Sequence, residues 1–394
     1  MLAWIDSLHR TVVRGGLIAG IAVGAASAAI AAPPPLDSDL ARGNPVETLP
    51  APTPHWLWVN DIVFGHMPDG KAHLVDGDSG KYLGQLNTGF GFGRMVVSPD
   101  GKTIYAPETY FARGTRGERT DIVTYYDAKT LEPTGETPIP PKRASNLAVS
   151  GNSQLTGDGR FLLIYFFNPG QSVGVVDVIA RKWVGEIETP GCALEYPAGE
   201  RSFFSICADG AVQLISLDER GNLAQQRRIE KVLEVEKDPV DEEPVRHQGT
   251  WLFSSFAGRI VPVTANADNV TTGEPWWLTT AAERAAKWRP GGHQKTAISP
   301  ALNRLYVLMR QGDLDTHKEP AQEVWVYDLA TRARIQRIKL TGMASGILVT
   351  RDAKPLLYTA FLGGSDIGVY DARGGQHLRT ITEVATTPTL LVGH

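Results

Sequence analysis

The chain has 394 residues, 42% of them hydrophobic, and its formal net charge at pH 7 is −4. This length and apolar content are enough for a sizeable core, and all-β propellers and barrels of this size fold as single domains. The acidic balance excludes the broad basic footprint that nucleic-acid binding requires. We therefore expect no nucleic-acid partner.

The first residues have the features of an export signal. Arg10 and Arg14 precede an apolar stretch of small residues over 15–32, which contains an A-x-A-like cleavage site. A membrane anchor is the alternative, but this Ala- and Gly-rich stretch is only weakly apolar, whereas a stable span needs about 20 strongly apolar residues. We predict a signal peptide over 1–31, a Pro-rich N-terminal arm over 32–54, and no membrane contact after cleavage.

A single pattern recurs along the rest of the chain. Apolar, β-rich residues lead into an aspartate, and a polar turn follows in which the aspartate side chain can accept backbone N–H groups. The copies lie at 73–81, 122–130, 173–181, 212–221, 258–266, 324–332 and 367–375. The copy at 258–266 is degenerate. Strand–turn–strand segments fall between copies, so each unit holds about four short strands over roughly 40–65 residues, as propeller blades do. The sequence therefore predicts an all-β fold, a seven-bladed β-propeller over 55–394; a pair of β-sandwiches is the alternative that the regular repeat disfavours.

Cys192 and Cys207 are the two cysteines of the chain. They flank a strand–turn–strand segment, whose antiparallel strands would bring the two side chains close enough to bond. An even cysteine count in an exported protein favours a disulfide, and closing a loop of about 15 residues is worth about 3 kcal/mol in the chain-entropy model. Two buried free thiols are the alternative, and two thiols alone fall far short of a zinc site.

Two insertions interrupt the repeat. Residues 230–248 are acidic, and we interpret them as a solvated outer strand and loop, with the Asp-Glu-Glu run at 241–243 on the surface. Residues 276–292 predict a short helix, because Thr280 and Glu283 form a capping box and a Pro-Gly pair follows the Ala-rich segment.

The two ends of the propeller domain complement each other. The last copy of the repeat runs out at residues 390–394, one strand short of a blade, and the alternating segment 55–64 has no blade of its own. Pairing the first strand with the last would close the ring and leave no exposed sheet edge. We therefore expect a ring closed by an N-terminal strand.

No segment has the spacing of a known catalytic motif. The chain lacks H-E-x-x-H, G-x-S-x-G, a phosphate loop and a clustered Cys/His set. We expect no catalytic residue and no metal ligand in this chain, although a propeller can also assemble a metal site from loops of different blades. The residues alone leave two functions open: a stand-alone, metal-dependent, lactonase-like hydrolase, or a non-enzymatic binding propeller.

Several short segments occur in an order that resembles one known family. They are VNDIVF (59–64), FARGTRGERTD (111–121), PPKR (140–143), VGVVD (173–177), Cys192 and Cys207 followed by ADG, KWRPGG (287–292), THKEPAQEVWVYD (316–328) and KPLLYTA (354–360). Over roughly residues 55–390 their order and spacing resemble the heavy subunit of the tryptophan tryptophylquinone amine dehydrogenases, which comprise methylamine and aromatic amine dehydrogenases. No single segment is very specific, so the resemblance depends on their shared order.

The resemblance implies a periplasmic enzyme of two heavy and two light chains that oxidises a primary amine to an aldehyde and ammonia. The heavy subunit would be a seven-bladed propeller without a cofactor, and the tryptophan tryptophylquinone and the catalytic base would belong to the light subunit. Electrons would pass to a small blue-copper protein of the amicyanin or azurin type. Some segments are closer to the methylamine type and others to the aromatic type, and we expect aromatic or arylalkyl amines as substrates.

The resemblance also suggests roles for two features of the chain. Phe64 lies where the family places a phenylalanine that lines the substrate channel; without the resemblance it would be an ordinary core residue at the end of a strand. Arg113, Arg116 and Arg119 lie in a loop before a strand, and arginine side chains suit interfacial carboxylates and carbonyls. We expect this loop to bind the light subunit or the second heavy subunit, with a solvated hairpin loop as the alternative.

Overall fold

The computed structural model describes residues 47–394 except 92, 145–146 and 394. The predicted signal peptide and most of the Pro-rich arm therefore lie outside the described residues. The described end of the arm, residues 47–54, contains no regular strand, and the amide of Leu49 donates to the carbonyl of Lys129 at 2.8 Å. In this part of the chain, no helix is long and apolar enough to cross a membrane.

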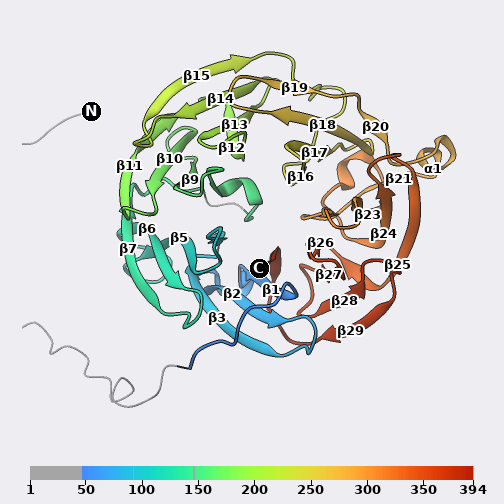
Figure 1. Cartoon of the computed structure of the whole chain (residues 1–394), viewed down its shortest axis with the longest axis horizontal. Coiled ribbons are helices and arrows are strands. Elements are labelled where there is room, and N and C mark those ends of the chain that lie inside the picture. Colours follow the sequence, from blue (N-terminus) through green and yellow to red (C-terminus); the bar gives the residue numbers. More distant parts are fainter. Residues whose placement is uncertain (1–46, 92, 145–146, 394) are drawn as a thin grey trace, which may run out of the picture. The chain divides into compact units, whose positions relative to one another are not determined.

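Seven antiparallel sheets form a ring of blades (Figure 1), which confirms the all-β, seven-bladed prediction. The first blade contains β1 (Trp56–Asp61), β2 (Gly70–Asp76), β3 (Tyr82–Gly89) and β30 (Pro388–Gly393). The second contains β4 (Val96–Val97), β5 (Thr103–Phe111), β6 (Arg119–Asp127) and β7 (Pro133–Ile139). The third contains β8 (Ser153–Leu155), β9 (Phe161–Phe166), β10 (Ser172–Asp177) and β11 (Lys182–Glu188). The fourth contains β12 (Cys192–Pro197), β13 (Ser202–Cys207), β14 (Val212–Leu217) and β15 (Leu223–Ile229).

The remaining blades carry the additional short elements. The fifth contains β16 (Val245–His247), β17 (Thr250–Ser254), β18 (Arg259–Ala265), β19 (Val270–Thr272) and β20 (Trp276–Trp277). The sixth contains β21 (Trp288–Pro290), β22 (Thr296–Ser299), β23 (Arg304–Gln311), β24 (Ala321–Asp328) and β25 (Arg334–Ala344). The seventh contains β26 (Gly346–Val349), β27 (Leu356–Ala360), β28 (Ile367–Asp371) and β29 (His377–Ile381). The helical segments are α1 (Ala281–Ala285) and the 3₁₀ turns η1 (Phe64–Asp69), η2 (Ser150–Asn152) and η3 (Leu314–Thr316).

The ring closes where the first strand meets the last. β1 pairs antiparallel with β30, so that Leu57 lies opposite Gly393 and Asp61 opposite Pro388. The expected pairing of the chain ends is confirmed, but the strands are divided differently. The seventh blade already has four strands of its own, and β30 becomes the innermost strand of the first blade.

Each copy of the sequence repeat contains the third strand of a blade, counted from the centre of the ring. The aspartate at the end of that strand then holds the turn to the outermost strand. The carboxylate of Asp127 accepts the amides of Lys129 and Thr130 at 2.8 and 2.9 Å, and Asp177 does the same for the two amides that begin the next turn. These local bonds explain why the repeat can be seen in the sequence.

Large side chains fill the spaces between neighbouring blades. Between the fourth and fifth blades, the ring of Tyr196 lies 5.5 Å from that of Trp251 and 5.3 Å from that of Phe253. The indole N–H of Trp251 donates to the carbonyl of Pro197 at 3.1 Å, so its polar atom is also satisfied. Burying side chains of this size stabilises the ring by about 1.5–3 kcal/mol each.

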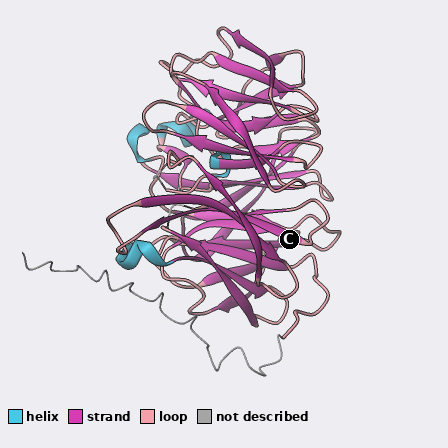
Figure 2. Cartoon of the chain, turned by 90° about the vertical axis from the view of Figure 1, so that its left-hand side faces the viewer, coloured by secondary structure: helices cyan, strands magenta, loops and turns pink. Residues whose placement is uncertain are grey.

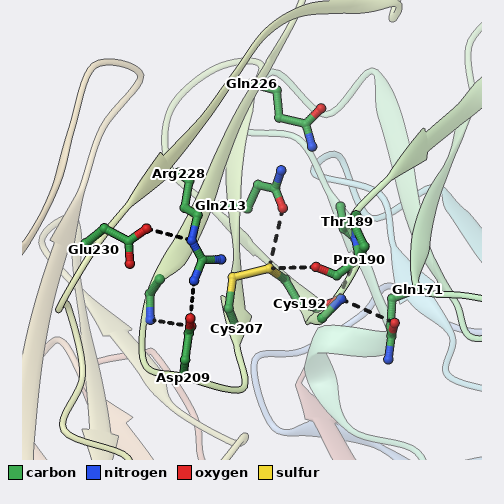
Figure 3. The surroundings of a disulfide bond; sticks show 12 residues. Gln171, Thr189, Pro190, Cys192, Cys207, Asp209, Gln213, Gln226, Arg228 and Glu230 are labelled. Carbon is green, nitrogen blue, oxygen red and sulfur yellow. Dashed lines mark hydrogen bonds and ion pairs between the residues drawn. A yellow bond between two sulfur atoms is a disulfide. The ribbon is translucent and has the colours of Figure 1, made fainter.

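Two local predictions can be compared directly with the structure. The capping box of α1 is present, since Thr280 and Glu283 exchange hydrogen bonds, but the helix is shorter than expected because the tryptophans on either side pair as β20 and β21. Cys192 lies opposite Cys207 on β12 and β13, and the two are bonded. The predicted disulfide is therefore confirmed (Figure 3).

Candidate partner-binding face

The functional residues expected from the sequence lie on one side of the ring. In an antiparallel blade, alternate connections emerge at opposite ends of the strands. The connections between second and third strands, and those between blades, therefore share one face, which we call the loop face. It includes the turns at 62–69, 112–118, 167–171 and 208–211. Figure 2 shows the helical segments toward this side of the propeller and the C-terminus toward the other.

Phe64 lies on the loop face and is 69% exposed, which excludes an ordinary core position. Its backbone is nevertheless firmly held where the chain ends meet. The amide of Phe64 donates to Thr387 Oγ1 at 3.2 Å, and Val63 before it has a left-handed φ of 46°. The amide of Val63 in turn donates to the buried carboxylate of Asp61 at 2.8 Å. The ring of Phe64 is therefore presented to the outside on a fixed backbone.

Asp61 organises this part of the loop face. Its carboxylate accepts the amides of Thr386 and Thr387 and lies 3.3 Å from His73 Nε2, so one side chain joins the first and last turns of the ring. Burial alone would raise the pKa of Asp61, but the hydrogen bonds from His73 and from the backbone outweigh burial and lower it. The carboxylate is thus stabilised in its charged form.

Glycines allow the segment that carries Phe64 to sit directly on its neighbour. The amide of Gly91 donates to the carbonyl of Met67 at 2.6 Å. A Cβ at Gly91 would lie 2.3 Å from the carbonyl oxygen of Ile62, so a larger residue would push the Phe64 turn outward. Gly91 therefore allows close backbone packing beneath the turn that carries Phe64.

The arginine loop has two different parts. Arg113 and Arg116 lie in the exposed turn between β5 and β6, where the amide of Arg113 donates to the carbonyl of Arg116 at 2.9 Å. Arg119 is already on β6, and its guanidinium binds the buried carboxylate of Asp121 through two bonds of 2.8 and 2.7 Å. It also donates to the carbonyl of Arg143 at 2.9 Å. Arg119 is therefore bonded within the chain. Among the described residues, the exposed guanidinium groups of Arg113 and Arg116 form no ion pair.

The sequence contained a signal for the role of Arg119. Residues two apart on a strand point to the same side, so Arg119 and Asp121 on one strand are natural partners. The strand begins at Arg119, earlier than the sequence predicts, so Arg119 belongs to β6 and not to the loop.

The acidic insertion differs from the solvated surface run that we expected. Asp241 and Glu243 are buried, with 1% and 4% of their surface exposed. Asp241 binds the buried ammonium of Lys295, and Lys318 bridges Asp241 at 3.1 Å and Glu242. The sequence could not show this burial, because the partner residues Lys295 and Lys318 belong to the sixth blade and are far away in the sequence.

A hollow of about 420 Å³ lies beside the disulfide on the loop face. Its walls are largely apolar and include Phe167, which is 52% exposed, together with Tyr165, Leu194 and the disulfide itself. At its outer edge the turn after Cys207 carries Asp209, which binds Arg228 (Figure 3). The loop face therefore combines exposed aromatic groups, an apolar hollow and free arginines, the composition typical of protein interfaces.

A model of the methylamine dehydrogenase heavy chain matches residues 55–394. The chain belongs to this family. The methylamine dehydrogenase heavy chain of Methylophilus methylotrophus is 30% identical over 391 residues, covering 97% of this chain and 95% of the relative. That of Methylobacillus flagellatus is 31% identical over 321 residues, 81% and 80% of the two chains. A solved protein of unknown function from Desulfotomaculum acetoxidans, 10% identical, has a TM-score of 0.57 over 86% of this chain and 98% of its own, a likeness of fold alone.

The resemblance drawn from the short sequence segments is thus confirmed, and the chain is an amine dehydrogenase heavy chain. Membership of this family implies a light-chain partner that holds the quinone. The structure contributes the location of the features that a partner could contact: Phe64, Arg113 and Arg116 all lie on the loop face. Within the described ranges, no group of three or more His, Cys, Asp or Glu side chains is placed to hold a metal ion.

Proposed function

We propose that this heavy chain works in the periplasm as the propeller subunit of a primary-amine dehydrogenase, and that its loop face binds the light subunit. The exposed ring of Phe64 on a fixed backbone carries the proposal. A largely exposed aromatic side chain contributes little to the folding stability of the isolated chain. It gains apolar contacts when a partner covers it. In the assembled enzyme, Phe64 would form part of the wall of the channel that leads to the quinone.

The tryptophan tryptophylquinone belongs, in this proposal, to the light subunit. Tryptophans around α1 have contacts within this chain: Trp325 is fully buried and packs on Trp288 at 5.0 Å, and Trp277 lies under the guanidinium of Arg284 at 4.2 Å. The Trp325 contact packs the end of the insertion on the sixth blade, and the Trp277 contact joins α1 to β20 of the fifth blade. The quinone would supply the two-electron oxidation of the amine, and the catalytic centre would be formed on the partner.

The contribution of this chain to catalysis is then steric. An apolar wall at Phe64 would admit the carbon skeleton of the amine and exclude water from the reacting centre. The assembly would contain two heavy and two light chains, and electrons would leave to a small blue-copper protein of the amicyanin or azurin type. The relatives reported above are named for methylamine, and we therefore propose short alkyl amines as substrates in place of the arylalkyl amines favoured by the sequence segments.

Purification from the native host without denaturation tests this function. We expect a small subunit to copurify, with a visible quinone band that bleaches when a primary amine is added. Methylamine and phenethylamine, added separately, distinguish the two substrate classes by their relative rates of bleaching. A colourless single polypeptide would refute the proposed function.

A Phe64→Ala substitution tests the channel wall. We expect unchanged folding stability, because the side chain is mostly exposed, and a change in relative kcat/KM between methylamine and bulkier amines. Ile179→Ala is the matched control, since Ile179 is 73% exposed but lies in a turn on the opposite face. Equal ratios of kcat/KM across the amine series in the Phe64 variant and the wild type would show that Phe64 does not shape the channel.

Arg113 and Arg116 test the docking role of the arginine loop. Because both side chains are exposed, the double variant Arg113→Ala and Arg116→Ala should keep its folding stability. It should bind the light subunit more weakly, by about tenfold if one charged contact is lost. Arg220→Ala, in an exposed turn on the opposite face, is the control. Unchanged assembly, measured by sedimentation across a dilution series, would contradict docking at this loop. Arg119→Ala is unsuitable for this test, since it removes an internal ion pair.

A further inference from the structure

A cavity of about 960 Å³ runs along the centre of the propeller. Its walls come from the inner strands of six blades, namely β4, β8, β16, β22, β26 and β30. The turns at 99–101, 248–249 and 350–351 also line it. These turns join first and second strands, so they lie on the face opposite the loop face. The cavity therefore has its mouth on the side that the proposed light-subunit site does not use.

Hydrogen bonds cross the ring at the loop-face end of this cavity. Ser150, at the entry to the third blade, donates from Oγ to Glu243 Oε2 in the fifth blade at 2.8 Å. His293 Nε2, at the entry to the sixth blade, donates to the carbonyl of Ala148 at 2.8 Å. The side chain of Gln294 also bonds the backbone of Leu391 in the first blade, at 2.9 and 2.8 Å. These contacts between non-adjacent blades lie at the end of the cavity away from the turns that form its mouth.

The charged residues of the pocket are mainly cationic. Arg94, Arg246 and Arg351 line it, and its carboxylate is Asp100 at the mouth. Among the residues that the structure describes, neither Arg246 nor Arg351 forms an ion pair. Asp100 accepts from Ser98 Oγ at 2.6 Å and is exposed at the mouth, where water screens its charge. A positive pocket in a chain of net charge −4 points to an anionic ligand.

Arg94 lies toward the loop-face end of the pocket, shortly before β4. Its Nη1 donates to the carbonyl of Ser153, while its buried Nε has no hydrogen-bond partner within the described part of the chain. Burial lowers the pKa of Arg94 to about 10, so the guanidinium stays charged at neutral pH, and the attraction of Glu243 opposes that shift. Burial also raises the pKa of Glu243 to about 7, which makes its compensation of Arg94 incomplete. A buried donor without a partner is unfavourable, and an acceptor oxygen from a ligand beside this guanidinium would reduce that cost.

The other two arginines of the pocket, Arg246 and Arg351, lie at its mouth. Arg246 lies over the ring of Trp251 at 5.6 Å, and both residues line the pocket. Arg351 lies two residues beyond the end of β26, one of the inner strands. Between the mouth and Arg94 the walls include Ile298, Ile347 and other apolar side chains, which suit a carbon skeleton better than a hydrated inorganic ion.

We propose that this pocket binds a small organic anion with two or more carboxylates, with one carboxylate at Arg94 and another at the mouth. Arginine binds carboxylates through paired, charge-assisted hydrogen bonds, and cationic groups at a mouth raise the rate at which anions enter. The proposal does not depend on the light subunit or on amine oxidation, because the pocket opens on the opposite face.

Isothermal titration of the purified native protein with citrate, succinate and inorganic phosphate tests the proposal. We expect saturable binding of one di- or tricarboxylate per heavy chain, weakened by added salt. The double variant Arg246→Gln and Arg351→Gln should lower the affinity about tenfold or more, and Arg94→Gln should abolish saturation. The mouth variants keep the test valid if Arg94→Gln fails to fold, because Arg246 and Arg351 are exposed. Arg220→Gln, an exposed arginine on the same face outside the pocket, is the matched control.

Each outcome of this titration is decisive. No saturation by any carboxylate, or equal affinity in the mouth variants and the control, would overturn the site. If inorganic phosphate bound as tightly as citrate, the pocket would select its ligand by charge alone. That result would overturn the proposal that the ligand is a carboxylate. Quinone bleaching by amines, measured on the same variants, should stay at the wild-type rate, so failure of the anion site and failure of the proposed enzyme function are separate results.

Discussion

Glu243 makes the stability of this propeller depend on pH in a direction that can be measured. Its carboxyl is buried, with 4% of the residue exposed, and accepts from both the amide and the hydroxyl of Ser150 across the ring. Burial raises its pKa from 4.5 to about 7, against the opposing effects of these hydrogen bonds and of Arg94. We predict that Glu243→Gln, which keeps a hydrogen-bonding group of the same shape, removes this pH dependence.

The size of the effect follows from the two pKa values. A shift from 4.5 to about 7 corresponds to about 3 kcal/mol, at 1.36 kcal/mol for each unit. Because the folded state holds the proton more tightly, the free energy of unfolding is highest below the unfolded pKa of 4.5 and falls as the pH rises through about 7. About 2 kcal/mol of this loss should occur between about pH 5.5 and pH 8.5.

Denaturant unfolding at several pH values between these limits measures the loss. Glu195 is also fully buried, and burial raises its pKa well above the ordinary value. It is present in both proteins, so the difference between wild type and variant isolates Glu243. Glu236→Gln, an exposed position in the same acidic insertion, is the control and should reproduce the wild-type slope. A Glu243→Gln slope equal to the wild-type slope would refute the reasoning.

Two further substitutions probe the ring itself. Replacing Cys192 and Cys207 together by serine opens a loop of 15 residues and should lower the free energy of unfolding by about 3 kcal/mol, measured against the wild type under oxidising and reducing conditions. Under reducing conditions the two proteins should unfold alike, and a persistent difference would mean that serine disturbs the packing. Asp121→Asn leaves the guanidinium of Arg119 without its buried carboxylate and should cost about 3–5 kcal/mol in denaturant unfolding, whereas a loss below about 1 kcal/mol would show that the pair is replaceable.

Local interactions explain which parts of the fold could be predicted from the sequence. The aspartate turns, the capping box of α1 and the cysteine pair each involve groups a few residues apart or on adjacent strands, so their patterns survive in the sequence. The exposed position of Phe64 could not be read in this way. It depends on Thr387, whose hydroxyl accepts the Phe64 amide from the other end of the chain, and on ring closure to bring the two ends together.

By itself, the sequence determined the blade repeat and the family, because these rest on local hydrogen bonding and on the order of short segments. It also predicted that the first strand pairs with the last and favoured the disulfide, and the structure confirms both. Only the tertiary structure decided which charges are buried. Glu243 and Ser150 are 93 residues apart, and Asp241 and Lys295 are 54 apart. Acidic residues in a polar insertion resemble a solvated surface until the ring places distant blades against them. Burial separates these carboxylates from water. At Asp241 the ammonium of Lys295 compensates this loss and the pKa is lowered, whereas at Glu243 burial dominates and the pKa is raised.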